Sequence, residues 1–250
     1  LSHTGYKEVQ SHVKGVHLTS GQARNMSFPF TPQPEQDRII EIVEELFSDL
    51  DNAIENLKKA QEQLKIYRQA VLKTAFEGKL VISNSKWHQV NLGDLGEWLG
   101  GGTPSKSNMA FWNNGTIPWV SPKDMKTDQI VDSQDHITES AIKNSTAKMI
   151  SSGAILVVVR SGILQHSFPV AVATVACAVN QDLKALVPTT NYSPAYIAWA
   201  LRAFSSDILH KCSKEGTTVQ SIEFPIFKRF SIPIPENIKD QERVVSKIEA

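Results

Sequence analysis

A heptad repeat near the start of the chain constrains its fold more than any other feature of the sequence. Between residues 35 and 77, apolar residues recur at alternating spacings of four and three. The seam positions are Ile39, Val43, Leu46, Leu50, Ala53, Leu57, Ala60, Leu64, Tyr67 and Val71. A period of about 3.5 residues is typical of a coiled coil. The segment therefore predicts a helical rod roughly 65 Å long, at ~1.5 Å per residue.

Charge and boundary residues support one continuous helix. Residues 35–55 hold eight acids against Arg38 alone, and residues 56–79 hold six bases against two acids. A helix macrodipole favours acids at its start and bases at its end. Pro34 suits the first helical turn, and Gly78 suits a left-handed stop. The alternative is a long helix packed on its own domain, but the regular seam favours a coiled coil.

From Trp87 onward the pattern changes to short β-like runs separated by turns rich in Gly, Pro, Asn and Ser. The expected strands are 87–92, 117–120, 154–160, 170–175 and 183–187, and residues 193–211 have helical spacing. Such a mixture indicates a mostly β domain with a few helices, of ordinary size for one domain. The predicted fold class is α+β, with a long coiled-coil helix joined to this domain.

An internal repeat divides the chain. Ser27-Phe28-Pro29-Phe30 precedes Gln36-Asp37-Arg38, and Ser231-Ile232-Pro233-Ile234 precedes Gln241-Glu242-Arg243. Each copy is interpreted as an edge strand followed by a helix start, so a second long helix should begin near Asp240. The expected order is the tail of a preceding domain at 1–34, the helix at 35–79, a complete domain at 80–235, and the start of the second helix at 236–250.

Composition excludes several protein classes. No run of 18 apolar residues occurs, and no basic-then-apolar leader opens the chain, so neither a membrane span nor export is expected. Cys177 and Cys212 lack the number and spacing of a disulfide framework or zinc site, so we expect a cytoplasmic protein. Because the chain starts at Leu1 and stops at Ala250 inside a predicted helix, we expect a fragment.

Three motifs resemble those of one protein family. Residues 101–105, Gly-Gly-Thr-Pro-Ser, and 111–121, Phe-Trp-Asn-Asn-Gly-Thr-Ile-Pro-Trp-Val-Ser, resemble the opening of a target-recognition domain in a type I restriction–modification specificity subunit. Residues 180–186, Asn-Gln-Asp-Leu-Lys-Ala-Leu, resemble its mid-domain signature. The proline-containing strand followed by a long helix is similar to its repeated central region.

This resemblance implies a non-catalytic DNA reader. Such subunits carry two recognition domains that read the halves of a split target, and two helices set the spacing and dock adenine-methyltransferase subunits. Motor-nuclease (restriction) subunits join to cut unmodified DNA. S-adenosylmethionine, ATP and Mg would then belong to the partner subunits, and this chain would need no cofactor. Residues 1–34 would be the remainder of a first recognition domain, and a second copy of the chain could pair through the helix.

Candidate DNA-binding residues lie in the turn-rich loops of the domain. They are Thr103, Ser105, Lys106, Arg160, Ser161, Gln165, His166, Lys211, Lys214, Thr217 and Thr218. Arg160 directly follows an apolar strand, and arginine can bind guanine in bidentate fashion in the major groove. For any one of these residues, a solvated loop charge or a local ion pair remains the alternative.

Other motifs are interpreted structurally. Gly100-Gly101-Gly102 lacks the pattern of a nucleotide-binding loop and is expected to be a flexible turn. Trp112 and Trp119 are expected to pack within the domain, and residues 180–182 to brace a turn before a strand. The histidines His88, His136 and His166 lack metal-ligand spacing, and the tetrapeptide of amino-methyltransferases is missing from the sequence.

Two function classes stay open. The first is a sequence-specific DNA-binding scaffold in a methyltransferase and restriction complex. The second is a coiled-coil protein–protein adaptor without DNA contact. Lys plus Arg equals Asp plus Glu, at 26 each, which favours the adaptor because phosphate attraction should be modest. The motif resemblance favours the DNA reader and outweighs this argument.

Overall fold

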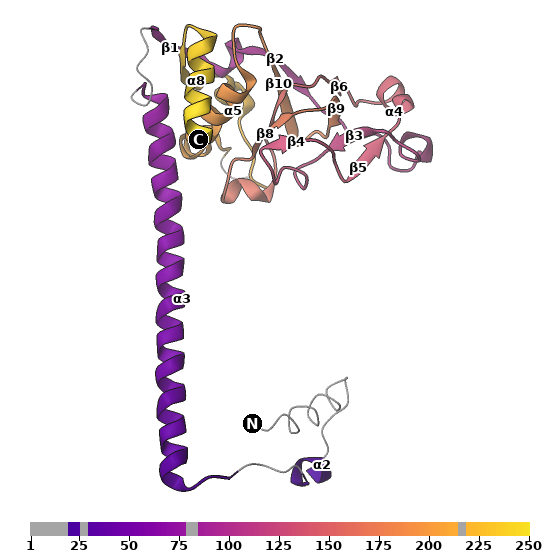
Figure 1. Cartoon of the computed structure of the whole chain (residues 1–250). Coiled ribbons are helices and arrows are strands. Elements are labelled where there is room, and N and C mark those ends of the chain that lie inside the picture. The colour runs from indigo at the N-terminus through magenta and orange to yellow at the C-terminus, as the bar shows by residue number, and fades with distance from the viewer. Residues whose placement is uncertain (1–19, 26–29, 79–84, 215–218) are drawn as a thin grey trace. The chain divides into compact units, whose positions relative to one another are not determined.

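The computed structural model describes residues 20–25, 30–78, 85–214 and 219–250 (Figure 1). The chain divides into two compact units, Leu1–Leu64 and Lys65–Ala250. The first unit holds the short helix α2, Ser20–Arg24, and most of the long helix α3, Gln33–Phe76. The second holds the last turns of α3 and every described strand. The predicted fold class, a long helix joined to a mostly β domain, is confirmed.

Helix α3 follows the heptad prediction closely. It spans 44 residues, begins two residues before the predicted start and ends one residue before the predicted end. Gly78 adopts a φ of 75°, which confirms it as the left-handed stop. The seam is exposed: Leu57 is 71% exposed, and Leu46 is 62% exposed. Only the end of α3 is buried, where Ala75 and Phe76 enter the core of the second unit.

The second unit contains a five-stranded sheet at its centre. In spatial order its strands are β2 (Gly96–Gly100), β10 (Leu183–Pro188), β7 (Ile155–Val158), β8 (Val170–Ala173) and β4 (Gln129–Ile130). Every residue of β7 is buried, as expected for a central strand covered on both faces. Its apolar run was the clearest strand signal in the sequence.

Two smaller sheets complete the β structure. In the four-stranded sheet the order is β5 (Asp135–Ile137), β3 (Ile117–Val120), β9 (Cys177–Val179) and β6 (Met149–Ile150). The pair β3–β9 is parallel, whereas the other two pairs are antiparallel. The two-stranded sheet pairs β1 (Trp87–Asn91) with β11 (Ser231–Pro235), which confirms 231–234 as a strand with one described neighbour.

Short helices connect and cover these sheets. They are η1 (Leu92–Asp94), η2 (Met109–Phe111), α4 (Glu139–Asn144), η3 (Gly162–Gln165), α5 (Pro194–Ala203), α6 (Ser205–Cys212), α7 (Phe224–Arg229) and α8 (Ile238–Glu249). In Figure 1, α5 and α8 lie side by side at the end of the unit away from β5 and α4. No described helix is long and apolar enough to cross a membrane.

The helical spacing over 193–211 is confirmed, and the segment forms two helices, α5 and α6, with a break at Phe204. No Gly or Pro marks this break. Instead, the ring of Phe204 packs between those of Phe76 and Phe230, with centroid distances of 6.3 Å to each. The break thus coincides with the aromatic packing of Phe204.

Helix α8 begins at Ile238, two residues before the expected start, and the Asn237 side chain caps it by accepting from the amide of Lys239. Gln241 is fully buried. Its Oε1 accepts from the amide of Ser193 at 2.8 Å, and its Nε2 donates to the carbonyls of Asn191 and Pro235. These bonds fasten the start of α8 to the body of the domain. Residues 27–29 of the first repeat copy lie outside the described residues.

Candidate nucleic-acid interface

Five segments distant in sequence meet where the parallel strands β3 and β9 end. The amide of Asn180 donates to the carbonyl of Val120 at 2.9 Å, which joins the turns that follow the two strands. The amides of Val159 and Arg160 both donate to the carbonyl of Asp182, which adds the end of β7. We call this group of segments, residues 101–103, 121–124, 159–161, 180–182 and 220–222, the loop edge.

Gly101 and Gly102 let the first segment lie directly on the end of β9. The amide of Gly102 donates to the carbonyl of Val179 at 3.0 Å, and its carbonyl accepts from Nε1 of Trp119 at 3.0 Å. A Cβ at Gly101 would lie 2.0 Å from the carbonyl oxygen of Val179. The expectation of a flexible turn here is therefore wrong, since backbone contacts on both sides hold the glycines. Trp119, only 5% exposed, packs as expected.

The Asn180-Gln181-Asp182 turn connects two of the predicted reader loops. As expected, it braces the chain before β10: Oδ1 of Asn180 accepts from the amide of Asp182 at 3.0 Å. It also reaches outward, because the hydroxyl of Thr103 donates to Oε1 of Gln181. Thr103 and Arg160, which are 57 positions apart, thus have partners on adjacent residues.

Arg160 is exposed, and Asp182 holds its guanidinium on one side. Nε of Arg160 donates to Oδ1 of Asp182 at 2.6 Å, and the other carboxylate oxygen accepts from Nδ2 of Asn180 at 3.1 Å. Within the described residues, the two outer nitrogens of the guanidinium have no partner. The local ion pair left open by the sequence is therefore present. This ion pair occupies Nε of Arg160. The two outer nitrogens stay available, and these are the atoms that could bind a guanine.

Residues 220–222 bring Lys214 to the same edge. The carbonyl of Gln220 accepts from the amide of Ser161 at 3.0 Å, and the carbonyl of Ser221 accepts from the amide of Lys214 at 2.8 Å. Ser221 also forms an isolated β-bridge with Arg160. Lys214 is exposed. The segment 220–222 therefore contacts the backbone at both predicted reader positions, Arg160 and Lys214.

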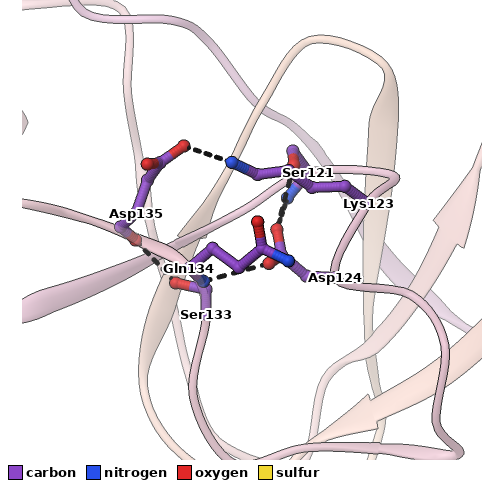
Figure 2. Close-up of polar contacts among 6 residues, drawn as sticks. All are labelled: Ser121, Lys123, Asp124, Ser133, Gln134 and Asp135. Atoms are coloured by element: carbon purple, nitrogen blue, oxygen red, sulfur yellow. Dashed lines mark hydrogen bonds and ion pairs between the residues drawn. The ribbon is translucent and has the colours of Figure 1, made fainter. Parts of the chain in front are cut away.

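The turn after β3 is fixed by a carboxylate (Figure 2). Oδ2 of Asp124 accepts from both the amide and the hydroxyl of Ser121 at 2.9 Å, and Oδ1 accepts from the amide of Gln134 at 3.0 Å. Nζ of Lys123 donates to Asp135 at 2.7 Å, and this hydrogen bond raises the pKa of Lys123 above its usual value. The loop edge is thus built from turns with internal hydrogen bonds.

The remaining predicted readers do not join this cluster through any described contact. Ser105 and Lys106 lie in an exposed turn beside Trp112, whose Nε1 donates to the carbonyl of Ser105. Gln165 and His166 are exposed at the far end of η3, and Nζ of Lys211 lies 5.7 Å above the ring of Phe230. Thr217 and Thr218 lie outside the described residues.

The sequence interpretation missed two residues of the cluster as candidates, Gln181 and Asp182. Both were assigned to a bracing turn, which is correct but incomplete. Their position directly before a strand, beside an expected strand end at Arg160, was the signal that could have placed them at the same edge.

The described residues contain no group of His, Cys, Asp and Glu that could hold a metal ion. Both cysteines are free and buried, and burial raises the pKa of Cys177 to about 11. A thiol with a raised pKa is a poor nucleophile near neutral pH. The chemistry that the loop edge can perform is hydrogen bonding, through hydroxyl, amide and guanidinium groups held by second contacts.

Comparison with known proteins gives a consistent picture. Residues 84–250 match the family model described as the type I restriction modification DNA specificity domain. The chain is 36% identical, over 233 residues, to the specificity subunit of the Escherichia coli type I restriction enzyme EcoR124I/EcoR124II, covering 91% of this chain and 55% of that subunit. It is 26% identical over 159 residues to the MjaIX specificity subunit of Methanocaldococcus jannaschii, covering 62% of this chain and 36% of that one.

Solved structures share the fold. One comes from a study of complex assembly and conformational transition in a type I restriction–modification system, with a TM-score of 0.65 and 19% identity over 98% of this chain and 59% of that one. Another is the HsdS subunit of Thermoanaerobacter tengcongensis, with a TM-score of 0.52 and 18% identity over 95% of this chain and 55% of that one. The chain thus spans about half the length of the relatives it matches.

Proposed function

Because this chain belongs to the family of type I restriction–modification DNA specificity domains, we propose that it is the DNA-reading component of such a system. In this proposal the chain is non-catalytic, and residues 80–235 form one target-recognition domain that reads half of a bipartite target. The remaining boundaries keep their predicted meanings: the tail of another recognition domain at 1–34, a spacer helix at 35–79 and the start of a second helix at 236–250.

The observation that carries the proposal is the convergence of Thr103, Arg160 and Lys214 on one loop edge. These residues come from separate loops, and hydrogen bonds to residues 180–182 and 220–222 connect them. Base recognition in the major groove requires several side chains to reach neighbouring base pairs at once. An edge with a guanidinium fork, a hydroxyl and an ammonium group meets this requirement.

Each side chain has a defined part in this mechanism. Arg160 donates from its outer nitrogens to O6 and N7 of a guanine while Asp182 keeps its Nε occupied. Lys214 and Lys106 neutralise backbone phosphates, which fixes the register of the domain on the duplex. Thr103 and Gln181 share a hydrogen bond that positions their polar groups beside Arg160.

The long helix serves as spacer and docking element. Its exposed seam, for example Leu50 at 52% and Leu57 at 71% exposure, offers an apolar stripe to another helix. In the proposed complex, this stripe pairs with a second copy of the chain or is covered by methyltransferase subunits, and restriction subunits join the assembly. S-adenosylmethionine, ATP and Mg act in those partner subunits.

The exposed seam also favours a second candidate, a coiled-coil adaptor that binds proteins and no DNA. One experiment separates the two candidates. The full chain is titrated, together with its methyltransferase subunit, into a random-sequence duplex pool in a gel-shift assay, and the shifted DNA is sequenced. A DNA reader enriches a defined base pattern, whereas an adaptor forms the protein complex without selecting any sequence.

A control makes this result specific to the chain. The same titration is repeated with the methyltransferase subunit alone and with Arg160→Ala in the full chain. Enrichment of one pattern by wild type, lost at one or more positions in the variant, supports the proposal. Identical pools recovered with and without the chain would reject it.

A further inference from the structure

Two lysines share one aromatic ring beside the loop edge. Nζ of Lys184, on β10, lies 5.5 Å from the ring centroid of Phe224, and Nζ of Lys228, on α7, lies 5.8 Å from the same centroid. The ring is held in place by its neighbours, since it packs edge-on against Trp98 at 5.4 Å and stacks on Phe227 at 6.0 Å. The two ammonium groups therefore have a common, fixed support.

Neither ammonium group is neutralised. Within the described residues, Lys184 and Lys228 form no ion pair, whereas Lys59, Lys123 and Lys143 each pair with a carboxylate. An anion bound beside either ammonium group would compensate its charge. The cation–π interaction with Phe224 attracts both ammonium groups, and it does not cancel their positive charge.

The residue opposite Lys184 is a glycine, which leaves room for the lysine side chain. Lys184 lies opposite Gly100 of β2 in the sheet register, and a Cβ at Gly100 would lie 2.9 Å from Nζ of Lys184. Any other residue at this position would force the ammonium group to move. Lys184 is half-buried, so the sheet around it restricts its aliphatic chain. Lys228 is exposed.

This pair continues the loop edge. Lys184 follows Asp182, the partner of Arg160, by two residues along the strand, which is about 7 Å. Phe224 follows Ser221, the β-bridge partner of Arg160, by three residues. Lys184 and Phe224 are therefore each close in the chain to a partner of Arg160.

We propose that Lys184 and Lys228 bind backbone phosphates of the same duplex whose bases the loop edge reads. The ammonium group is a compact, strongly charged donor that suits phosphate oxygens without requiring a fixed orientation. Phosphate contacts of this kind position the protein and contribute sequence-independent affinity. The inference rests on the proposed DNA-reading function and identifies a phosphate-contact site that the sequence interpretation did not include.

The test compares the full chain with the Lys184→Met/Lys228→Met double variant on a random-sequence duplex, at several salt concentrations. Methionine keeps an unbranched stem over Phe224 and removes only the charge. Binding should weaken roughly eightfold for each lysine at about 0.1 M salt, and the slope of log affinity against log salt should flatten by about one unit for each. Lys143→Met, exposed and paired with Glu139 on α4, is the matched control and should change neither quantity.

Each result supports or overturns the proposal. A double variant that binds with the affinity and salt slope of wild type overturns the phosphate site while leaving DNA binding intact. If wild type itself binds no duplex at low salt, the proposed function fails, and the phosphate site with it. If the double variant unfolds at lower urea, the single variant Lys228→Met, at the exposed position, decides: a salt slope flattened by about one unit supports the site, and an unchanged slope overturns it.

Discussion

Nε of Arg160 donates to Oδ1 of Asp182 at 2.6 Å, and Asp182 is held in turn by Nδ2 of Asn180. This chain of contacts restricts how the guanidinium can turn. Lost side-chain freedom is a large part of the cost of binding, so an arginine that is already ordered loses less on meeting its target. Asp182 is therefore a positioning residue for Arg160 in the proposed mechanism.

The first prediction concerns this pair. Arg160→Ala should cost about 1–3 kcal/mol of binding free energy and relax the preference at one base pair. Asp182→Asn, which keeps the side-chain shape and removes the charge, should weaken discrimination at the same base pair without flattening the salt slope. Affinities for the cognate duplex and for single-mismatch duplexes at two salt concentrations measure both effects. An equal loss for every sequence would show that Arg160 contacts phosphate instead.

The second prediction concerns Lys106 and Lys214, two exposed lysines on separate loops. If each meets a phosphate, its alanine variant should weaken binding to all sequences alike and flatten the salt dependence by about one unit. Lys59→Ala, on α3 and ion-paired with Glu55, serves as the control. If Lys214→Ala changes the sequence preference, the wild-type Lys214 side chain contacts a base instead of a phosphate. If Arg160→Ala, Lys106→Ala and Lys214→Ala all behave as wild type, the placement of the interface is wrong.

The third prediction concerns the exposed seam of α3. Leaving a large apolar side chain in water forgoes roughly 1.5 kcal/mol or more of burial free energy, and the seam repeats this many times. We expect the isolated chain to pair in antiparallel fashion through α3, and Leu50→Glu/Leu57→Glu to dissociate the pair. Light scattering at micromolar concentration measures the mass, and Lys58→Glu, beside the seam, is the control. A stable, folded wild-type monomer would count heavily against pairing.

The fourth prediction treats α3 as a ruler. Inserting four residues near 58–60 adds ~6 Å of helix and should lengthen the unread DNA spacer of a complete complex by about one or two base pairs. The bases recognised in each half-site should stay the same, because the loop edge lies in the other unit. Sequencing of methylated or selected sites gives both quantities. A changed base preference with an unchanged spacer length would contradict the role of α3 in setting the spacing.

The fifth prediction concerns stability. Gln241 is fully buried and makes three hydrogen bonds, so Gln241→Ala leaves the amide of Ser193 and the carbonyls of Asn191 and Pro235 without this partner. The loss should be about 1–3 kcal/mol of unfolding free energy, measured by urea denaturation. Glu242→Ala, at the exposed neighbouring position, should stay within about 0.5 kcal/mol of wild type. Equal effects of the two variants would contradict this role of Gln241.

The elements with a strong local pattern were predictable from sequence. The heptads and Gly78 gave α3 to within two residues at each end, and β3 was predicted with its observed bounds, because helix period, turn residues and apolar runs act locally. The strands β2, β4, β5, β6 and β9 were missed. Four of them have two or three residues, and β2 begins and ends with glycine, so none carries a period that can be recognised.

The candidate site was predictable only where a local sequence signal marked it. Arg160 was found because it directly follows the apolar run 155–159. The role of Asp182 depends on the pairing of β7 with β10, and the contact of Thr103 with Gln181 depends on the hydrogen bond from Gly102 to the carbonyl of Val179. Such long-range registers leave no mark on a single sequence. The break at Phe204 likewise coincides with contacts to rings from other parts of the chain, those of Phe76 and Phe230.

The close contact of Gly101 and Gly102 with the backbone around them has a consequence for discrimination between targets. A Cβ at either position would lie 2.3 Å or less from a neighbouring atom, so neither position accepts a side chain unless the surrounding atoms shift. In the proposed mechanism, this close packing opposes a shift of the loop toward a duplex with one altered base pair. We then expect the altered base pair to leave hydrogen bonds unmade, which lowers the affinity for that duplex.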